Sequence, residues 1–217
     1  MRFQDRHDAG TRLALRLRGE HLTDPIVLAL PRGGVPVAFE VAKGLNAPLD
    51  VTVTRKIGAP SRPELAVGAI AEGGEPELDR DMLNALRLTP RELAPTIALE
   101  RAELERRMKH YRGDRQAPEI QGRTVLLIDD GLATGSTARA AVRSLRRRGP
   151  RRLVLAVPVC PPETARRLQE EADDVISLLT PPDFRAVGVW YVDFGQTSDA
   201  QVMTLLEQAR RDARASH

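Results

Sequence analysis

Residues 125–137 read Val125-Leu126-Leu127-Ile128-Asp129-Asp130-Gly131-Leu132-Ala133-Thr134-Gly135-Ser136-Thr137, and this stretch decides the fold. Its four apolar residues predict a buried strand, and the pattern over residues 136–148 predicts a helix after the loop. Glycines let a backbone approach a ligand closely, and hydroxyls at a helix N-terminus, where N–H groups are free, favour a phosphate. Two adjacent carboxylates beside that loop can accept hydrogen bonds from a sugar diol. We therefore predict that this loop holds a phosphorylated ribose.

Two better-known phosphate loops do not fit these residues. A nucleoside-triphosphate loop of the type G-x-x-x-x-G-K-[ST] requires a lysine where this chain has Ser136, and the loop lacks the dinucleotide pattern G-x-G-x-x-G. A monophosphate is therefore the better ligand. The competing structural interpretation is that Asp129 only caps the helix and the small residues form a tight turn.

On both sides of this stretch, apolar periodicity predicts strands that alternate with helices. We expect strands at 26–30, 51–54, 125–128, 153–159 and 175–179, and helices at 8–18, 35–45, 136–148 and 163–172. This order is typical of an α/β domain with a doubly wound, mostly parallel sheet. An extra strand at 65–70 and a long charged helix at 91–112 interrupt the alternation. We therefore predict one domain over residues 1–217, with a helical insertion at about 75–121.

Composition and charge bear on whether this protein binds nucleic acid. The 33 lysines and arginines against 30 acidic residues leave a net charge of +3. Six arginines cluster in one short region: Arg143, Arg146, Arg147, Arg148, Arg151 and Arg152. Aromatic residues that could stack on bases do not alternate with them, which favours a charged helix end over a nucleic-acid surface.

Cysteine usage and hydropathy indicate a compartment. The single cysteine, Cys160, cannot form an intramolecular disulfide, and the chain has no cysteine and histidine cluster with zinc spacing. This usage indicates a reducing environment. No apolar run approaches the ~20 residues that a membrane-spanning helix needs, and residues 1–19 lack the apolar core of a secretory signal. We therefore expect a cytoplasmic protein that does not enter a membrane.

A second loop with glycines, Pro31-Arg32-Gly33-Gly34, lies between a predicted strand and a predicted helix. The planar guanidinium of Arg32 suits a diphosphate. Loops at the carboxyl ends of neighbouring parallel strands face one crevice, so this loop and residues 129–137 are expected to share a ligand. The alternative is an ordinary turn.

Two further segments carry candidate ligand contacts. Arg55-Lys56 precedes Gly58-Ala59-Pro60, which has enough glycine and proline to form a mobile flap, and its two cations would neutralise a diphosphate. The alternative is a solvated strand end. Trp190, the only tryptophan, lies in an aromatic segment and offers a ring that would stack on a planar base, with core packing as the alternative.

Residues 125–137 resemble the signature with which type I phosphoribosyltransferases bind phosphoribosyl diphosphate (PRPP). The wider chain resembles phosphoribosyltransferase-like proteins of bacteria, from Phe3-x-Asp5-Arg6 to Val192-Asp193-Phe194-Gly195. The resemblance implies that Asp129 and Asp130 bind the ribose 2- and 3-hydroxyls. It implies that the 5-phosphate is bound by Ala133, Thr134, Gly135, Ser136 and Thr137. It also implies a small hood formed by a C-terminal segment at about 181–199.

The resemblance implies roles for other residues as well. Diphosphate binding is implied for Arg32, Gly33, Gly34 and Lys56. Catalytic roles are implied for Arg55, Lys56, Glu72 and Asp130. The Arg55-Lys56 pair is similar to that of adenine and orotate enzymes, and Glu72 falls where adenine-type enzymes place an acid, although an ordinary structural acid would look the same. Base binding is implied for Trp190 and Asp193, and Mg²⁺ binding, through water or the ribose, for Asp129 and Asp130.

The expected reaction transfers the 5-phosphoribosyl group from PRPP to a nitrogenous base and releases diphosphate, with Mg²⁺ as cofactor. The expected partners are PRPP, a base or other amine acceptor, and a second copy of the chain in a homodimer. Hypoxanthine-type enzymes carry an aspartate where this chain has Ala133 and a lysine near Val159-Cys160-Pro161, which argues against a 6-oxopurine.

Two other functions stay open at this point. One is a regulator on the same fold that senses PRPP or a nucleotide and binds nucleic acid through the arginines after Ser144. The other is a hydrolase or phosphorylase that acts on a phosphoribosyl group. Because Cys160 has no histidine near it in the sequence, we expect it to be a small buried residue rather than a nucleophile.

Overall fold

The computed structural model describes residues 2–215, which fold around a five-stranded sheet. Its strand order is β2 (Leu49–Val51), β1 (Pro25–Ala29), β6 (Thr124–Ile128), β7 (Arg152–Val159) and β8 (Asp174–Leu179). All four neighbouring pairs are parallel. Ala29 at the end of β1 is opposite Ile128 at the end of β6, so the loops that follow these strands start side by side.

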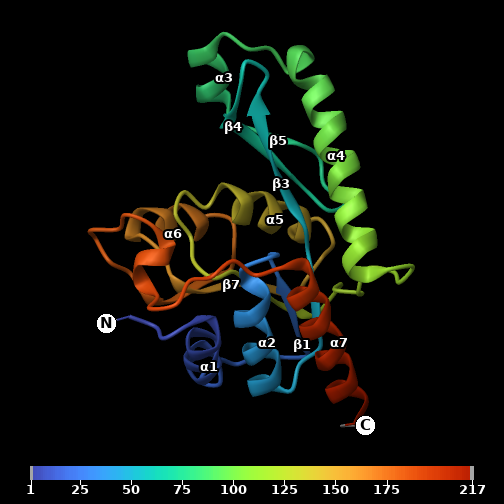
Figure 1. Ribbon diagram of the computed structural model, residues 1–217, viewed down its shortest axis with the longest axis vertical. Coiled ribbons are helices and arrows are strands. Elements are labelled where there is room, and N and C mark those ends of the chain that lie inside the picture. The colour runs from blue at the N-terminus through green and yellow to red at the C-terminus, as the bar shows by residue number, and fades with distance from the viewer. Residues whose placement is uncertain (1, 216–217) are drawn as a thin grey trace.

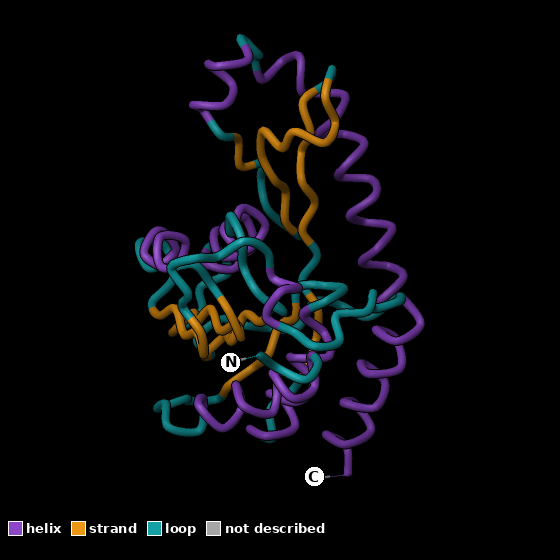
Figure 2. The backbone as a smooth tube through the Cα atoms, turned by 60° about the vertical axis from the view of Figure 1, so that its left-hand side comes forward, coloured by secondary structure: helices purple, strands orange, loops and turns teal. Residues whose placement is uncertain are grey.

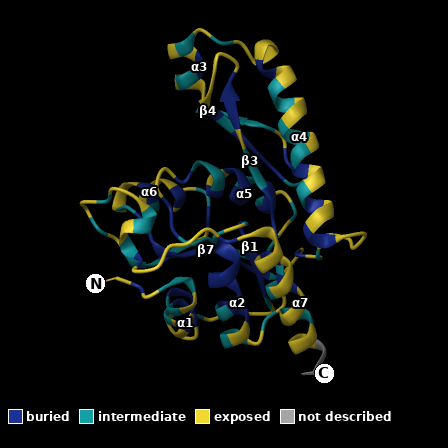
Figure 3. Ribbon diagram, in the orientation of Figure 1, coloured by how far each residue is buried: buried dark blue, intermediate teal, exposed yellow. Residues whose placement is uncertain are grey.

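Helices cover both faces of this sheet, which confirms the predicted doubly wound α/β fold. One face packs against α1 (Arg6–Leu17), α2 (Gly34–Leu45) and α7 (Asp199–Ala215), and the other against α5 (Ser136–Arg146) and α6 (Pro162–Leu168). Successive residues of a strand point to opposite faces. Accordingly, Leu126 lies in the first core and Leu127 in the second. Figure 3 shows these strands as the buried centre of the molecule.

A second unit, which we call the arm (residues 54–112), projects from the parallel sheet (Figures 1 and 2). It contains the antiparallel strands β3 (Thr54–Ala59), β4 (Arg62–Ala71) and β5 (Glu77–Leu78), with the helices α3 (Arg80–Leu86) and α4 (Pro90–Arg112). The predicted long helix and the extra strand are therefore present. This excursion begins earlier than the helical insertion predicted at about 75–121, and the division into domain and insertion stays a prediction.

The prediction of one strand at 51–54 is wrong, because the chain leaves the parallel sheet inside that run. Val51 pairs in parallel with Ala29, whereas Thr54 pairs antiparallel with Ala71 of the arm. The expected flap at residues 58–60 is also different: Gly58 and Ala59 belong to β3 and pair with β4 across two register shifts. Small residues allow this hairpin to approach α5, where Ala140 packs against Ala69 and Ala71.

Arg112, the last residue of α4, joins the base of the arm to the parallel sheet. Its buried guanidinium donates to the Glu72 carboxylate, to Asp50 Oδ2 at 3.2 Å and to the Val51 carbonyl at 2.9 Å. These three partners lie where the chain leaves β2 and where it leaves β4. A buried charge needs such partners, because its desolvation is otherwise uncompensated.

We predict that Glu72→Ala lowers the free energy of unfolding, measured by urea denaturation, by about 3 kcal/mol, because it leaves part of a buried charge unpaired. Glu75→Ala is the matched control, since the Glu75 side chain is 82% exposed and reaches Arg101 only at 3.7 Å. The control should change stability by no more than about 0.5 kcal/mol. Equal effects of the two substitutions would contradict the structural role of Glu72.

Candidate functional site

Asp129 and Asp130, the acid pair, follow β6 directly and are largely buried. The Asp129 Oδ1 atom accepts the Asp130 backbone N–H at 2.9 Å, and Asp130 Oδ2 accepts Arg6 Nε at 2.8 Å. Burial raises the pKa of both carboxyls, and the neighbouring Asp130 charge raises the pKa of Asp129 further, while Arg6 opposes the rise in both. Hydroxyl donors or a further cation would therefore stabilise the charged pair.

The loop after β1 lies directly against this acid pair. A Cβ atom added to Gly33 would lie 2.1 Å from Asp130 Oδ2, and one added to Gly34 would lie 2.9 Å from Asp129 Cα. The Leu30 N–H also donates to the Ile128 carbonyl at 2.9 Å. The structure thus brings together the two loops for which the sequence predicts a shared ligand, and glycine is what allows their close approach.

Residues 133–137 form an open turn at the start of α5. Gly135 is the N-cap of α5 in the left-handed conformation (φ 73°), and Ala133 and Thr134 are exposed. The turn is held from behind, because Thr164 Oγ1 donates to the Ala133 carbonyl at 2.7 Å. Within residues 2–215, the backbone N–H groups of residues 134–137 donate no hydrogen bond. Free amides at a helix N-terminus are suited to bind a phosphate.

The predicted cations lie on different sides of this site. Arg32 is exposed, with Nη1 4.0 Å from Asp199 Oδ2 at the start of α7. Arg55 and Lys56 of β3 line a cavity of about 440 Å³ together with Thr137 of the turn at residues 133–137. Arg55 Nε donates to Glu100 Oε2 at 2.6 Å, whereas Lys56 is exposed and forms no ion pair within the described part of the chain. Lys56 is therefore the cation available to a ligand in that cavity.

Glu72 does not lie with these residues. Its carboxylate is bound by Arg112 at the base of the arm, and its carbonyl accepts the Ser144 hydroxyl at 2.6 Å. The catalytic role expected of Glu72 stays a prediction, but these contacts support the structural alternative.

Residues 181–199, which we call the hood segment, contact the acid pair at Tyr191, whose hydroxyl donates to the Asp130 carbonyl. Trp190, in the short 3₁₀ helix η1 (Val187–Trp190), packs against the apolar cluster of Phe3, Ala9 and Tyr191, and its indole Nε1 is buried without a partner among the described residues. Asp193 is exposed, and its Oδ1 accepts the Gly195 N–H at 3.0 Å. The packing of Trp190 favours the core alternative, and base binding by these two residues stays a prediction.

Sequence reasoning missed Arg6, Tyr191 and Phe194 as site residues. Arg6 binds Asp130, and its guanidinium lies 3.9 Å from the centroid of the Phe194 ring. The Tyr191 hydroxyl donates to the Asp130 carbonyl at 2.5 Å. A signal was present, because both ends of the bacterial resemblance, Phe3-x-Asp5-Arg6 and residues 192–195, meet at the acid pair.

The acid pair fits the mode in which proteins bind Mg²⁺. This ion prefers oxygen ligands and is usually held by one or two carboxylates together with substrate phosphates. Among the described residues, no group of three or more His, Cys, Asp or Glu side chains could form a site made by protein alone. A magnesium ion would therefore depend on the ligand as well as on Asp129 and Asp130.

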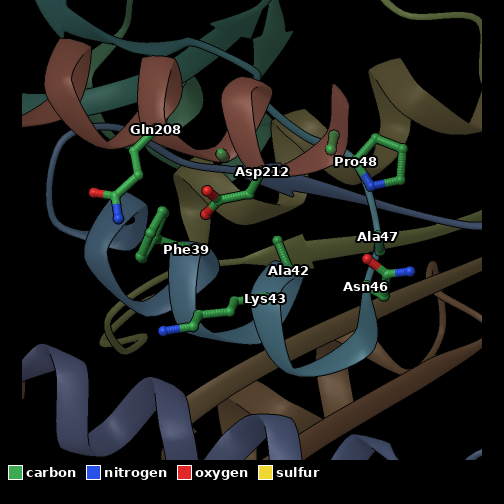
Figure 4. Close-up of a pocket in the computed structure, with 10 residues that line it drawn as sticks. Phe39, Ala42, Lys43, Asn46, Ala47, Pro48, Gln208 and Asp212 are labelled. Carbon is green, nitrogen blue, oxygen red and sulfur yellow. The ribbon is translucent and has the colours of Figure 1, made fainter. Parts of the chain in front are cut away.

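Cys160 and one further cavity are not part of the candidate site. Cys160 is buried, which raises the pKa of its thiol to about 11, so the structure supports its expected role as a packed residue. A separate cavity of about 500 Å³ lies between α2 and α7 and is lined in part by Phe39, Lys43 and Gln208 (Figure 4). None of the predicted site residues lines it.

The arginine cluster is largely neutralised by acids. Arg143 contacts Glu171 and Glu77, and the other ion pairs are Arg146 with Asp173, Arg147 with Glu77, and Arg152 with Asp174 and Glu20. Among the described residues, no helix is both long and apolar enough to cross a membrane.

Together, the fold and the meeting of the two loops define the class of α/β proteins whose candidate ligand loops lie at the carboxyl ends of parallel strands. The model of the phosphoribosyl transferase domain family matches residues 3–194, and this chain belongs to that family. The resemblance drawn from the loop and the two ends of the chain is therefore confirmed.

Several relatives support the assignment. The chain is 46% identical to the "Putative phosphoribosyl transferase" of Mycobacterium tuberculosis over 97% of its own length, but it spans only 47% of that protein. It is 31% identical to a uracil phosphoribosyltransferase of Lactobacillus gasseri, over 66% of this chain and 68% of that one. The crystal structure of TT1426 from Thermus thermophilus is similar with a TM-score of 0.82 and 46% identity, over 96% of this chain and 99% of that one.

The contact between the two loops can be tested with Gly34→Ala. The added Cβ would lie 2.8 Å from the Ile128 carbonyl oxygen and 2.9 Å from Asp129 Cα, so the backbone must shift. We expect the free energy of unfolding, measured by urea denaturation, to fall by about 1–3 kcal/mol. Gly19→Ala is the control, because its nearest neighbour would be 3.6 Å away. A wild-type stability in Gly34→Ala would contradict the described contact.

Proposed function

We propose that this chain transfers the 5-phosphoribosyl group from PRPP to a nitrogenous base and releases diphosphate. The observation that carries the proposal is the meeting of three features at one sheet edge. These are the acid pair, the glycine loop packed against it and a turn with free backbone amides. Together they match the diol, the diphosphate and the 5-phosphate of one PRPP molecule.

In this proposal, the amides and hydroxyls of residues 134–137 bind the 5-phosphate at the N-terminus of α5. The Asp129 and Asp130 carboxylates accept hydrogen bonds from the ribose 2- and 3-hydroxyls. These donors would lower the raised pKa of both carboxyls, because hydrogen bonds to a carboxylate favour its charged form. Binding of the ribose thus offsets part of the cost of holding two charges in a buried place.

The diphosphate lies on the side of Gly33 and Gly34, where Arg32 supplies positive charge, and Lys56 supplies positive charge from the cavity that Thr137 also lines. Bound Mg²⁺, held by the acid pair and the ligand, would neutralise further negative charge on the diphosphate. As the bond from C1 to the diphosphate breaks, the ribose gains positive charge, which the neighbouring carboxylates stabilise. Catalysis is then a matter of position and electrostatics, without a covalent enzyme intermediate.

The acceptor enters beneath the hood segment. Uracil phosphoribosyltransferases are among the relatives. In addition, Ala133 and residues 159–161 depart from the pattern of hypoxanthine-type enzymes. We therefore propose a nitrogenous base as the acceptor class, to be identified by Mg²⁺-dependent diphosphate release across purines, pyrimidines and other amines. The regulator that binds nucleic acid is disfavoured, because acids already pair with Arg143, Arg146 and Arg152.

Asp129→Asn should abolish PRPP binding, measured by calorimetry in the presence of Mg²⁺. An amide has one acceptor oxygen where a carboxylate has two, so it cannot accept hydrogen bonds from the diol through both atoms. It also lacks the negative charge with which a carboxylate binds the metal. Asp114→Asn, at an exposed position after α4, is the control and should bind as the wild-type protein does. An unchanged affinity in Asp129→Asn would remove the basis of the proposal.

Lys56→Ala should lower kcat/KM for diphosphate release about 100-fold, the scale expected when one electrostatic donor to the developing charge is lost. The assay is steady-state diphosphate release with the best acceptor of the panel. Lys43→Ala is the control, because Lys43 is also an exposed lysine but lies beside the separate cavity between α2 and α7. If both variants kept wild-type rates, Lys56 would have no part in the reaction.

A further inference from the structure

Residues 3 and 4 pair with the hood segment through backbone hydrogen bonds. Phe3 forms a parallel bridge to Tyr191, in which the Phe3 N–H donates to the Trp190 carbonyl at 2.8 Å and the Val192 N–H donates to the Phe3 carbonyl at 2.8 Å. The Asp193 N–H donates to the Gln4 carbonyl at 2.9 Å. The chain then enters α1 with Asp5 as the N-cap, which places Arg6 in the first turn, beside the acid pair.

Arg6 contacts three groups that come from two separate parts of the chain. Its Nε donates to Asp130 Oδ2 at 2.8 Å, its Nη1 donates to the Gly195 carbonyl at 2.7 Å, and its guanidinium covers the Phe194 ring. The Arg6 side chain is only 12% exposed. A guanidinium presents donors in a fixed plane, so these contacts hold Asp130 and the hood in one arrangement.

Tyr191 provides a second link between the same parts. Its hydroxyl donates to the Asp130 carbonyl, and its ring lies 5.4 Å from the Phe3 ring and 5.0 Å from the Phe194 ring. Asp130 is therefore tied to the hood through both its side chain and its backbone. A displacement of the Asp130 carboxylate must change its contact with Arg6, and Arg6 in turn contacts Phe194 and Gly195.

We propose that Arg6 is a positioning residue that couples ligand binding at the acid pair to the arrangement of the hood. This inference rests on the proposed function, in which the ribose hydroxyls donate to the carboxylate that also accepts Arg6. When these hydroxyls also donate to the Asp130 carboxylate, the Arg6 side chain shifts, and the hood residues that it contacts shift with it. Binding of PRPP at the acid pair therefore changes the arrangement of the hood segment, beneath which the acceptor enters.

The chain contains a natural reporter for this coupling. Trp190 is the only tryptophan and lies in the hood, where its carbonyl accepts the Phe3 N–H. Arg6→Ala and Arg6→Lys are the test variants, because lysine keeps a charge but loses the planar fork. Arg12→Ala is the matched control: Arg12 lies on the same helix and near the Phe3 ring, but its ion pair is local, with Asp8.

The first measurement is Trp190 emission at a Mg²⁺-PRPP concentration that calorimetry shows to be saturating. We expect an emission change in the wild-type protein and in Arg12→Ala, a smaller one in Arg6→Lys, and loss of most of it in Arg6→Ala. Should Arg6→Ala fail to fold or bind PRPP, Arg6→Lys carries the comparison. A wild-type emission change in the Arg6 variants, or no change in a wild-type protein that binds PRPP, would overturn the inference.

The second measurement needs no ligand. Hydrogen exchange at the amides of Phe3, Val192 and Asp193 should be faster in Arg6→Ala than in Arg12→Ala, because Arg6 holds the hood against Asp130. Equal exchange in the two variants would also overturn the inference. A wild-type protein that does not bind PRPP would instead overturn the proposed function. The exchange comparison alone would then test whether Arg6 links Asp130 to the hood segment.

Discussion

Two adjacent carboxylates held at the end of a buried central strand are the constraint on which the rest of this structure depends. Burial and mutual repulsion raise the pKa of Asp129, so the surroundings must supply donors and positive charge. Arg6, in the first turn of α1, supplies a donor and a positive charge to Asp130. Gly33 and Gly34 allow a second loop to pack against the acid pair, because they have no side chain in between. The geometry leaves the neighbouring turn open to an anion.

The arm places a cation near the start of α5. Its hairpin brings Lys56 to the cavity that Thr137 also lines, so a cation of the arm lies near the turn at residues 133–137. The buried guanidinium of Arg112 ties the points where the chain enters and leaves this hairpin, through Glu72 and Asp50. Lys56, which lies near the start of β3, therefore depends for its position on an ion-pair cluster at the same end of these strands, the base of the arm.

Much of this could be predicted from the sequence, and the limits have physical causes. Regular apolar periods predicted the parallel sheet, and the acid pair with its loop is local in sequence, so both were found. The run at 51–54 has uniform β-branched character, and only its pairing partners show that it spans two sheets. Likewise, the contact of Glu72 with Arg112, forty positions further along, cannot be read from the residues around Glu72. Arg6 lies over a hundred positions from Asp130, and no local pattern connects them.

The bridge between Phe3 and Tyr191 bears on how the protein can be handled. Chain ends are usually the safest places to shorten a protein or to attach a purification tag. Here the residues just after the start pack into the apolar cluster of the hood, and Arg6 reaches the acid pair. A bulky group attached directly before Phe3 would therefore disturb the packing around the acid pair.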